Sequence, residues 1–191
     1  AHVFTCGESY VYDTEGQAYR TVEIDGNCWM AENLNTGTTL ANAATDPTDN
    51  GAIEKWCYDG NLCDTYGGLY MWDEAMGWST DPGVQGICPA GWHLPTNAEL
   101  SCLVALYDPS TAGTDLKENG QSGFDLILGG EMNGDSDVFD LKDDYGILYS
   151  SSELGPGPTY AFIYYVRAST DVVIDDTNLK TYGFSIRCLK D

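Results

Sequence analysis

The residues of this chain that could do acid–base chemistry are few, and none lies in a recognisable catalytic motif. His93 is one of only two histidines, and a general base needs a nucleophile or carboxylate at hydrogen-bonding distance. Its surroundings hold neither a Gly-x-Ser-x-Gly elbow nor a His-Glu-x-x-His pair. We therefore expect no catalytic residues: His93 should be packed and hydrogen-bonded, and Glu32 should pair locally. A small hydrolase or oxidase that uses Glu32, His93 or a cysteine is the enzyme alternative.

A second possible chemistry is calcium binding by the segment 133–144, which is dense in oxygen ligands. Hard cations favour such ligand sets. The EF-hand spacing fails, because no glycine occupies the turn position. A solvated acidic turn is the favoured interpretation, and calcium held by Asp135, Asp137 and Asp140 is the weaker one. We expect no other metal and no cofactor.

Seven cysteines favour disulfides and an oxidising compartment. The zinc alternative lacks support, because only the pair Cys57 and Cys63 is closely spaced and no Cys-x2-Cys or His cluster accompanies it. Our hypothesis for the pairing is Cys6–Cys28, Cys57–Cys63 and Cys88–Cys188. The remaining Cys102 lies among apolar residues of an expected helix, so we predict a buried free thiol.

The charge of the chain restricts its partners. Thirty acidic residues face eight basic ones, for a net charge of −22. Nucleic acid is an improbable partner, because binding it needs basic residues that displace counterions. An anionic membrane surface is disfavoured for the same reason. A cationic partner, calcium or a salty habitat would fit, and plain solubility is the simplest explanation. No run of 18 apolar residues is present to span a bilayer.

The local patterns predict one α+β domain with two helices packed on a twisted, mostly antiparallel sheet that carries long loops. Turn residues separate short alternating strands near the start, which is typical of hairpins. Thr96 and Glu99 form a capping box before a helix over 98–107, and 69–76 has helical spacing. We expect the later strands at 124–128, 138–141, 147–151, 160–167, 172–174 and 183–189.

The segment 160–167 is unusual because both of its faces are apolar or aromatic. Period two places Tyr160, Phe162 and Tyr164 on one face, with Ala161 and Ile163 on the other. One face could be core while the other presents large side chains to a partner, as recognition surfaces do. The alternative is a strand covered on both sides.

A series of short sequence motifs, spread over almost the whole chain, resembles the motifs of one protein family in the same order. They are Asp13-x-Glu-Gly-x-x-Tyr19, Trp29 to Leu34, Trp56-Cys-Tyr58, Tyr66 to Tyr70 with Trp72, Gly86 to Thr96, Gly123-Phe124, Ser150 to Glu153, and Lys180 to Cys188. In these blocks the chain resembles the Fibrobacter succinogenes major paralogous domain, a branch of the C-type-lectin-like fold. The resemblance implies a single C-type-lectin-like domain over 1–191, divided into an N-terminal hairpin region 1–34, a loop and helix region 35–110, and a C-terminal sheet 111–191 with the ligand-binding surface.

Some members of that family are similar to variable proteins of diversity-generating retroelements, in which rewritten codons near the C-terminus encode a binding surface. By position, the resemblance implies a contact surface between Ser152 and Lys180. Tyrosine-rich surfaces gain contact area at low entropy cost. The candidate contact residues are Thr159, Tyr160, Phe162, Tyr164, Arg167, Ser169, Thr170, Asp171, Val173, Asp175, Asp176 and Asn178.

Two departures narrow this expectation. The Glu-Pro-Asn, Gln-Pro-Asp and Trp-Asn-Asp signatures of calcium-dependent sugar-binding lectins are absent, and so is the reactive cysteine pair of formylglycine-generating enzymes. We therefore expect a non-enzymatic, extracellular or cell-surface display protein, a monomer, which binds a protein or glycan. The alternatives are an adhesin-like or structural surface domain without diversification and, less favoured, a formylglycine-generating-enzyme-like oxidase.

Overall fold

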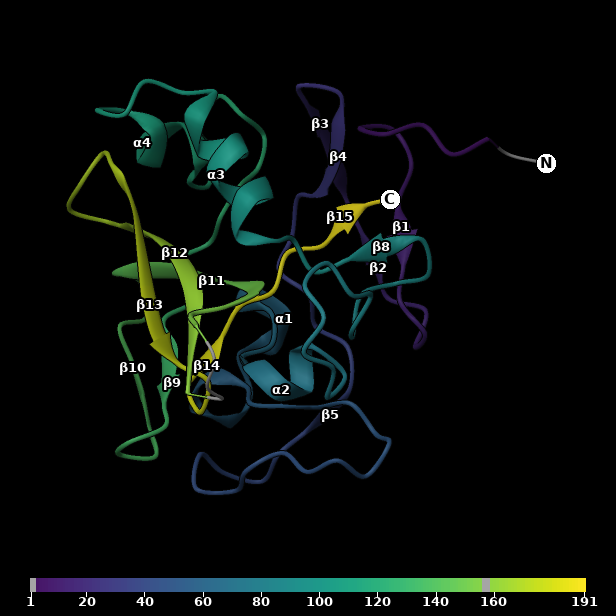
Figure 1. The fold of residues 1–191 in the computed structure, drawn as a ribbon, viewed down its shortest axis with the longest axis vertical. Helices are drawn as coiled ribbons and strands as arrows, with labels where there is room; N and C mark the ends of the chain where they lie inside the picture. Colours follow the sequence, from purple (N-terminus) through teal and green to yellow (C-terminus); the bar gives the residue numbers. More distant parts are fainter. Residues whose placement is uncertain (1–2, 156–158) are drawn as a thin grey trace.

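The structure is a computed structural model that describes residues 3–155 and 159–191. It is mixed and mostly strand, with several antiparallel sheets and short helices (Figure 1). This confirms the α+β class in outline. The strands are shorter and more dispersed than a single sheet would require, and loops join them throughout.

The N-terminal region begins with a hairpin of β1 (Val11–Tyr12) and β2 (Ala18–Tyr19). A four-stranded sheet follows, in the order β3 (Thr21–Ile24), β4 (Asn27–Met30), β15 (Leu189–Lys190) and β8 (Trp92–His93). Asp25 and Gly26 link β3 to β4 with φ angles of 50° and 76°, the left-handed conformation that a two-residue Asp-Gly hairpin turn needs. The end of the chain thus completes a sheet that its beginning starts.

A second four-stranded sheet also depends on the C-terminal segment. Its order is β10 (Val138–Asp140), β9 (Glu131–Asn133), β14 (Gly183–Phe184) and β7 (Tyr70–Met71). The strands β5 (Thr38–Thr39) and β6 (Glu54–Lys55) pair in parallel. The expected strand 183–189 is therefore two strands in two sheets, and the residues between them cross the core.

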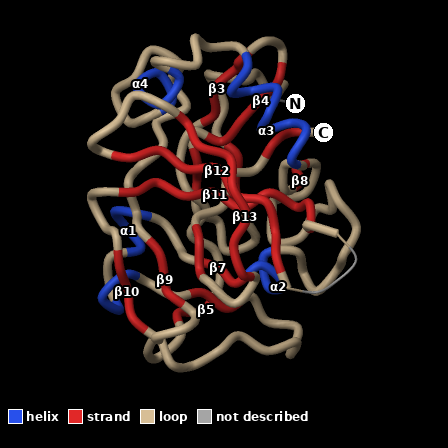
Figure 2. Tube along the Cα trace, turned by 60° about the vertical axis from the view of Figure 1, so that its left-hand side comes forward, coloured by secondary structure: helices blue, strands red, loops and turns tan. Residues whose placement is uncertain are grey.

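The third large sheet is three-stranded, with β12 (Tyr160–Arg167) between β11 (Tyr145–Glu153) and β13 (Val173–Leu179). The three strands run side by side through the middle of the molecule (Figure 2). The sequence pattern predicted the limits of β12. It placed β13 too early and too short, because Asp175 and Asp176 interrupt the apolar pattern of an edge strand.

The helices of the described residues are α1 (Cys63–Tyr66), α2 (Trp72–Ala75), α3 (Asn97–Ala105) and α4 (Ala112–Leu116), with a 3-10 turn at Tyr58–Gly60. The capping box of α3 is formed as predicted. Two expectations were wrong. The helix over 69–76 shrinks to α2, because Tyr70 and Met71 pair with β14. The strand over 124–128 does not form, since only Leu126 makes a bridge, to Lys117.

The pairs Cys6–Cys28, Cys57–Cys63 and Cys88–Cys188 are the disulfides of the structure, which confirms the predicted pairing. Cys88–Cys188 closes a loop with a sequence separation of 100, and closing such a loop restricts the unfolded chain by about 4.7 kcal/mol in the entropy model. Cys102 is free, as expected, but it is exposed rather than buried. Its side chain is open to solvent, whereas those of Leu100 and Leu103 are buried in the core.

Arg187 is a buried cation at the crossing point between β14 and β15. Its side chain is 1% exposed. Nε donates to Asn33 Oδ1, one terminal nitrogen donates to the carbonyls of Met30 and Phe124, and the other to that of Asp125. Burial lowers the pKa of Arg187 to about 9, so the guanidinium remains charged at neutral pH. One side chain thus joins the segments around 30, 124 and 187.

Arg187→Met should lower the free energy of unfolding by about 3–5 kcal/mol, because it leaves several buried acceptors without a donor. Urea denaturation of the oxidised protein measures the change. The control is Arg20→Met, since Arg20 has a side chain that is 51% exposed. Losing its two surface ion pairs, with Glu32 and Asp125, should cost about 1 kcal/mol or less. Equal effects of the two substitutions would contradict the role given to Arg187.

Candidate functional site

The twelve candidate contact residues do not share one surface. Alternation along β12 and β13 places Tyr160, Phe162, Tyr164, Val173 and Asp175 on one side of the three-stranded sheet. Arg167, Asp176 and Asn178 lie on the other side. Thr159, Ser169, Thr170 and Asp171 lie in the segments that flank the two strands. Only the first group gathers on one surface.

That first side is open at one end and covered at the other. At the open end Tyr160 pairs with Leu179, and Phe162 pairs with Thr177. Tyr160 is 43% exposed, and the other three are partly exposed. Asp175 is exposed next to them, and its carboxylate makes no hydrogen bond or ion pair within the described residues. We call these five residues, Tyr160, Phe162, Asp175, Thr177 and Leu179, the sheet face.

Tyr164, by contrast, belongs to the core. It is 6% exposed and packs in the cluster that contains Leu100, Leu148 and Val166. Its hydroxyl donates to Asn97 at the start of α3, with an oxygen–oxygen distance of 2.9 Å to Oδ1. Its expected role in ligand contact is therefore corrected, because α3 covers this half of the sheet. Ala161 and Ile163 are buried on the opposite side, so β12 is covered on both sides along most of its length.

A cavity of about 380 Å³ borders the sheet face where α3 meets the sheet. Val104, Pro109, Ala112 and Val173 provide apolar walls, and Asp175 and Ser101 provide polar atoms. Three residues of the three-stranded sheet line this cavity, namely Tyr164, Val173 and Asp175. The sheet face is thus an aromatic strip with a hollow and a free carboxylate at one end.

The outer edge of β13 is partly blocked against strand addition. The amide of Thr177 donates to Asp176 Oδ1 at 2.8 Å, and the amide of Leu179 donates to Asn178 Oδ1 at 2.7 Å. An edge strand normally leaves such amides available to another chain. Asp176 and Asn178 therefore have a local structural use, and a partner would dock on the sheet face rather than along the edge.

The turn between β12 and β13 is anchored to the segment around α4. The Asp171 carboxylate accepts from the Thr114 hydroxyl at 2.6 Å, and Lys117 Nζ donates to the carbonyls of Arg167 and Thr170. The Arg167 guanidinium lies 4.9 Å from the ring centroid of Tyr145. The candidate contact residues Arg167, Thr170 and Asp171 therefore help to hold the sheet in place. They do not extend the sheet face.

Buried polar contacts support the sheet face at its open end. The Tyr149 hydroxyl donates to the carbonyls of Leu179 and Tyr182. Lys180 is buried, with Nζ 2.9 Å from a Glu153 oxygen and 3.7 Å from the centroid of a Trp72 ring. Glu153, Lys180 and Trp72 thus form one connected set of contacts. The sequence analysis missed Thr177 and Leu179. The pairing of β13 with β12, had it been known, would have placed them beside Phe162 and Tyr160.

The acid–base candidates are engaged in structural contacts. Glu32 accepts a hydrogen bond from the Arg20 amide and pairs with its guanidinium. His93 lies between two carboxylates, with Nδ1 2.7 Å from Asp191 and Nε2 3.2 Å from Glu99. Glu99 is itself the N3 residue of the capping box that starts α3. His93 therefore links β8, the last residue and the helix start, as a packed, hydrogen-bonded residue would.

The three calcium candidates are not assembled into a ligand set. Asp135 accepts from the Tyr182 hydroxyl, and Asp140 accepts from the amide of Leu141. Within residues 3–155 and 159–191, no three His, Cys, Asp or Glu side chains are grouped so that they could hold a metal ion. Asp140 instead pairs in register with Glu131. Glu131 is buried, and burial, together with the Asp140 carboxylate, raises its pKa to about 7.

Comparison with known families matches residues 22–190 to the Fibrobacter succinogenes major domain. The chain belongs to this family, as its sequence blocks indicated. No curated protein and no solved structure matches the chain. In the part of the chain that the structure describes, no helix is long and apolar enough to cross a membrane.

Glu131 gives a prediction about pH. A carboxyl with a higher pKa in the folded chain binds its proton more tightly there, so its contribution to the free energy of unfolding falls as pH rises from 4.5 to about 7. Glu131→Gln should therefore stabilise the protein at pH 8, by on the order of 2 kcal/mol. The gain should vanish near pH 4. Chemical denaturation across pH tests this, with the exposed Glu8→Gln as control. A gain independent of pH would contradict the assignment.

Proposed function

We propose that this family member is a non-enzymatic binding module that contacts a protein or glycan ligand through the sheet face. The observation that carries the proposal is the position of Tyr160, Phe162 and Leu179 on an open sheet surface. Exposed aromatic side chains on a rigid support are typical of recognition surfaces, because they supply contact area at low entropy cost. The blocked edge of β13 favours docking on the face.

The finer identity of the module is also a proposal. The family resemblance favours a C-type-lectin-like arrangement and a variable protein of a diversity-generating retroelement. Three disulfides favour an oxidising location, extracellular or on the cell surface. The retroelement hypothesis predicts a neighbouring reverse transcriptase gene and a near-copy of the 3′ coding segment that differs at adenines. Finding neither would leave an adhesin-like surface domain.

Replacing Tyr160 and Phe162 together with serine should abolish ligand binding while leaving the fold intact. The wild-type protein is screened on protein and glycan arrays, and each hit is measured again with the variant. We expect the affinity to fall by at least tenfold, about 1.4 kcal/mol, because truncated aromatic anchors cost that much or more. The free energy of unfolding should change by roughly 1 kcal/mol or less.

The matched control replaces Tyr10 and Tyr12, exposed aromatic residues elsewhere on the molecule, 52% and 60% exposed. Hits that survive this control but are lost with the sheet-face variant support the proposal. Hits that both variants retain would overturn it. Tyr164→Ala should instead unfold or destabilise the domain, by about 3–5 kcal/mol as for other large core side chains.

A further inference from the structure

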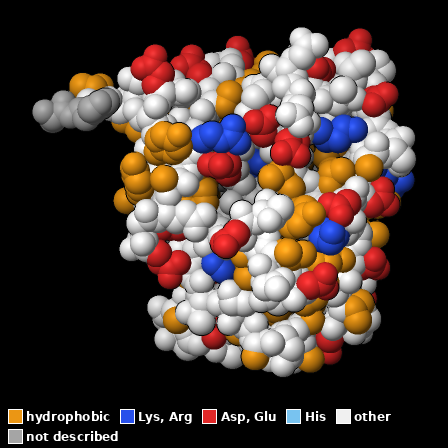
Figure 3. Space-filling model, turned by 180° about the vertical axis from the view of Figure 1, so that it is seen from behind, with side chains coloured by type: hydrophobic (Ala, Val, Ile, Leu, Met, Phe, Trp, Pro, Cys, Tyr) orange, Lys and Arg blue, Asp and Glu red, His pale blue; other side chains and the backbone are white. Residues whose placement is uncertain are grey.

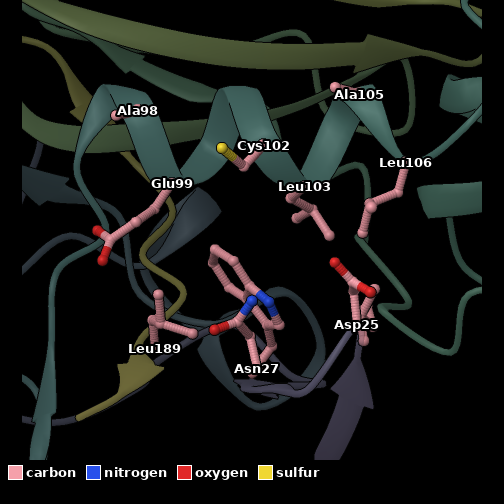
Figure 4. A pocket seen from close by; sticks show the side chains of 11 residues that line it. Asp25, Asn27, Ala98, Glu99, Cys102, Leu103, Ala105, Leu106 and Leu189 are labelled. Carbon is pink, nitrogen blue, oxygen red and sulfur yellow. The ribbon is translucent and has the colours of Figure 1, made fainter.

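A hollow surface lies between α3 and the hairpin of β3 and β4, apart from the sheet face. One cavity there has a volume of about 440 Å³. Figure 4 shows Leu103 and Leu106 projecting from α3 toward it, with Asp25 of the hairpin turn opposite and Leu189 at the other side. Ile24 and Trp29 also line it. Most of its lining is apolar, and none of its residues belongs to the sheet face.

A second cavity of about 760 Å³ continues the first beyond the hairpin turn. The two share Ile24, Asp25 and Leu106 in their linings. The second is polar and acidic, with four carboxylates among its lining side chains, those of Glu23, Asp25, Asp108 and Asp115. Together the cavities form one groove, which we call the α3 groove, with an apolar half and an acidic half that meet at Leu106.

The charges of the α3 groove are unbalanced. Among the described residues that line it, none is Lys, Arg or His. Asp108 accepts from Ser110, and Asp115 accepts from the Thr111 hydroxyl. These are neutral partners, and the carboxylates of Glu23 and Asp25 have no hydrogen bond or ion pair within the described part of the chain. Figure 3 shows how sparse Lys and Arg are against Asp and Glu on one whole face of the protein.

We propose that the α3 groove binds a basic, amphipathic peptide segment of a partner protein. Apolar side chains of the segment would fill the half lined by Trp29, Leu103 and Leu106. Its lysines or arginines would lie at the acidic half, where their charges offset the mutual repulsion of the carboxylates. A purely apolar ligand would leave those charges unpaired, and an anionic one would be repelled. Charge complementarity therefore selects the partner.

The chain carries its own reporter of occupancy, because the free thiol of Cys102 is exposed and lines the apolar half. The probe is the acetylated, amidated peptide Lys-Leu-Lys-Leu-Lys, and the readout is the rate at which iodoacetamide alkylates Cys102. At a peptide concentration about ten times Kd, alkylation should slow roughly tenfold, since only the unoccupied protein reacts. The bound fraction should fall with added salt, because ion pairs at the surface are screened.

Two control peptides separate binding in the groove from general attraction to an acidic protein. Lys-Gly-Lys-Gly-Lys keeps the charge without apolar anchors, and Glu-Leu-Glu-Leu-Glu keeps the anchors with the opposite charge. Neither should protect Cys102. No protection by the lysine–leucine peptide, or equal protection by either control peptide, would overturn the proposal.

Two matched substitutions locate the site. Leu106 is 47% exposed in the groove and Val138 is 49% exposed elsewhere, so glutamate at either position should be tolerated by the fold. Leu106→Glu should remove the protection of Cys102, because the new carboxylate would lie against the leucine side chains of the bound peptide. Val138→Glu should leave the protection of Cys102 unchanged. Equal loss with both variants would show that attraction to the whole surface, not the groove, binds the peptide.

Discussion

The structure depends on a buried guanidinium that pairs with no carboxylate among the residues that the structure describes. Arg187 donates to Asn33 and to the carbonyls of Met30, Phe124 and Asp125, and its charge is taken out of water at considerable cost. That cost is offset only if all three segments stay in register around it. The side chain therefore fixes the relative positions of the segments around residues 30, 124 and 187, and the pairing of β15 with β4 joins the first and last of these as well. Cys188, the next residue, adds a covalent link to Cys88.

The C-terminal segment also connects this constraint to the sheet face. β14 completes one sheet, Arg187 and Cys188 cross the core, and β15 completes another. Just before β14, Lys180 and the backbone of Leu179 and Tyr182 hold the open end of the three-stranded sheet through Glu153 and Tyr149. The contacts that fix the backbone of this sheet are made by buried side chains. The outward side chains of the sheet face can therefore be replaced without a change in its shape. This separation of frame and face is what a displayed binding module requires.

The sequence predicted the features that local patterns or pairwise chemistry determine. The three disulfides, the capping box of α3, the Asp25-Gly26 hairpin and the limits of β12 were all anticipated. It could not predict which part of β12 is open, because both faces of the strand are apolar. The position of α3 decides this, since α3 covers Tyr164 and leaves Tyr160 and Phe162 on the same face accessible. Tyr70 and Met71 were misassigned to a helix because their strand partners lie more than a hundred residues later in the chain. The exposure of Cys102 and the α3 groove depend likewise on contacts between segments distant in sequence.

If the crossing at Arg187 fixes the sheet face to the rest of the molecule, the sheet face should be a rigid surface. Native-state hydrogen exchange measures this directly, since it gives the free energy of opening for each segment. We expect the paired amides of β12 to exchange only with global unfolding, together with those of β4. Exchange of β12 through a local opening, at a free energy several kcal/mol below that of β4, would contradict it.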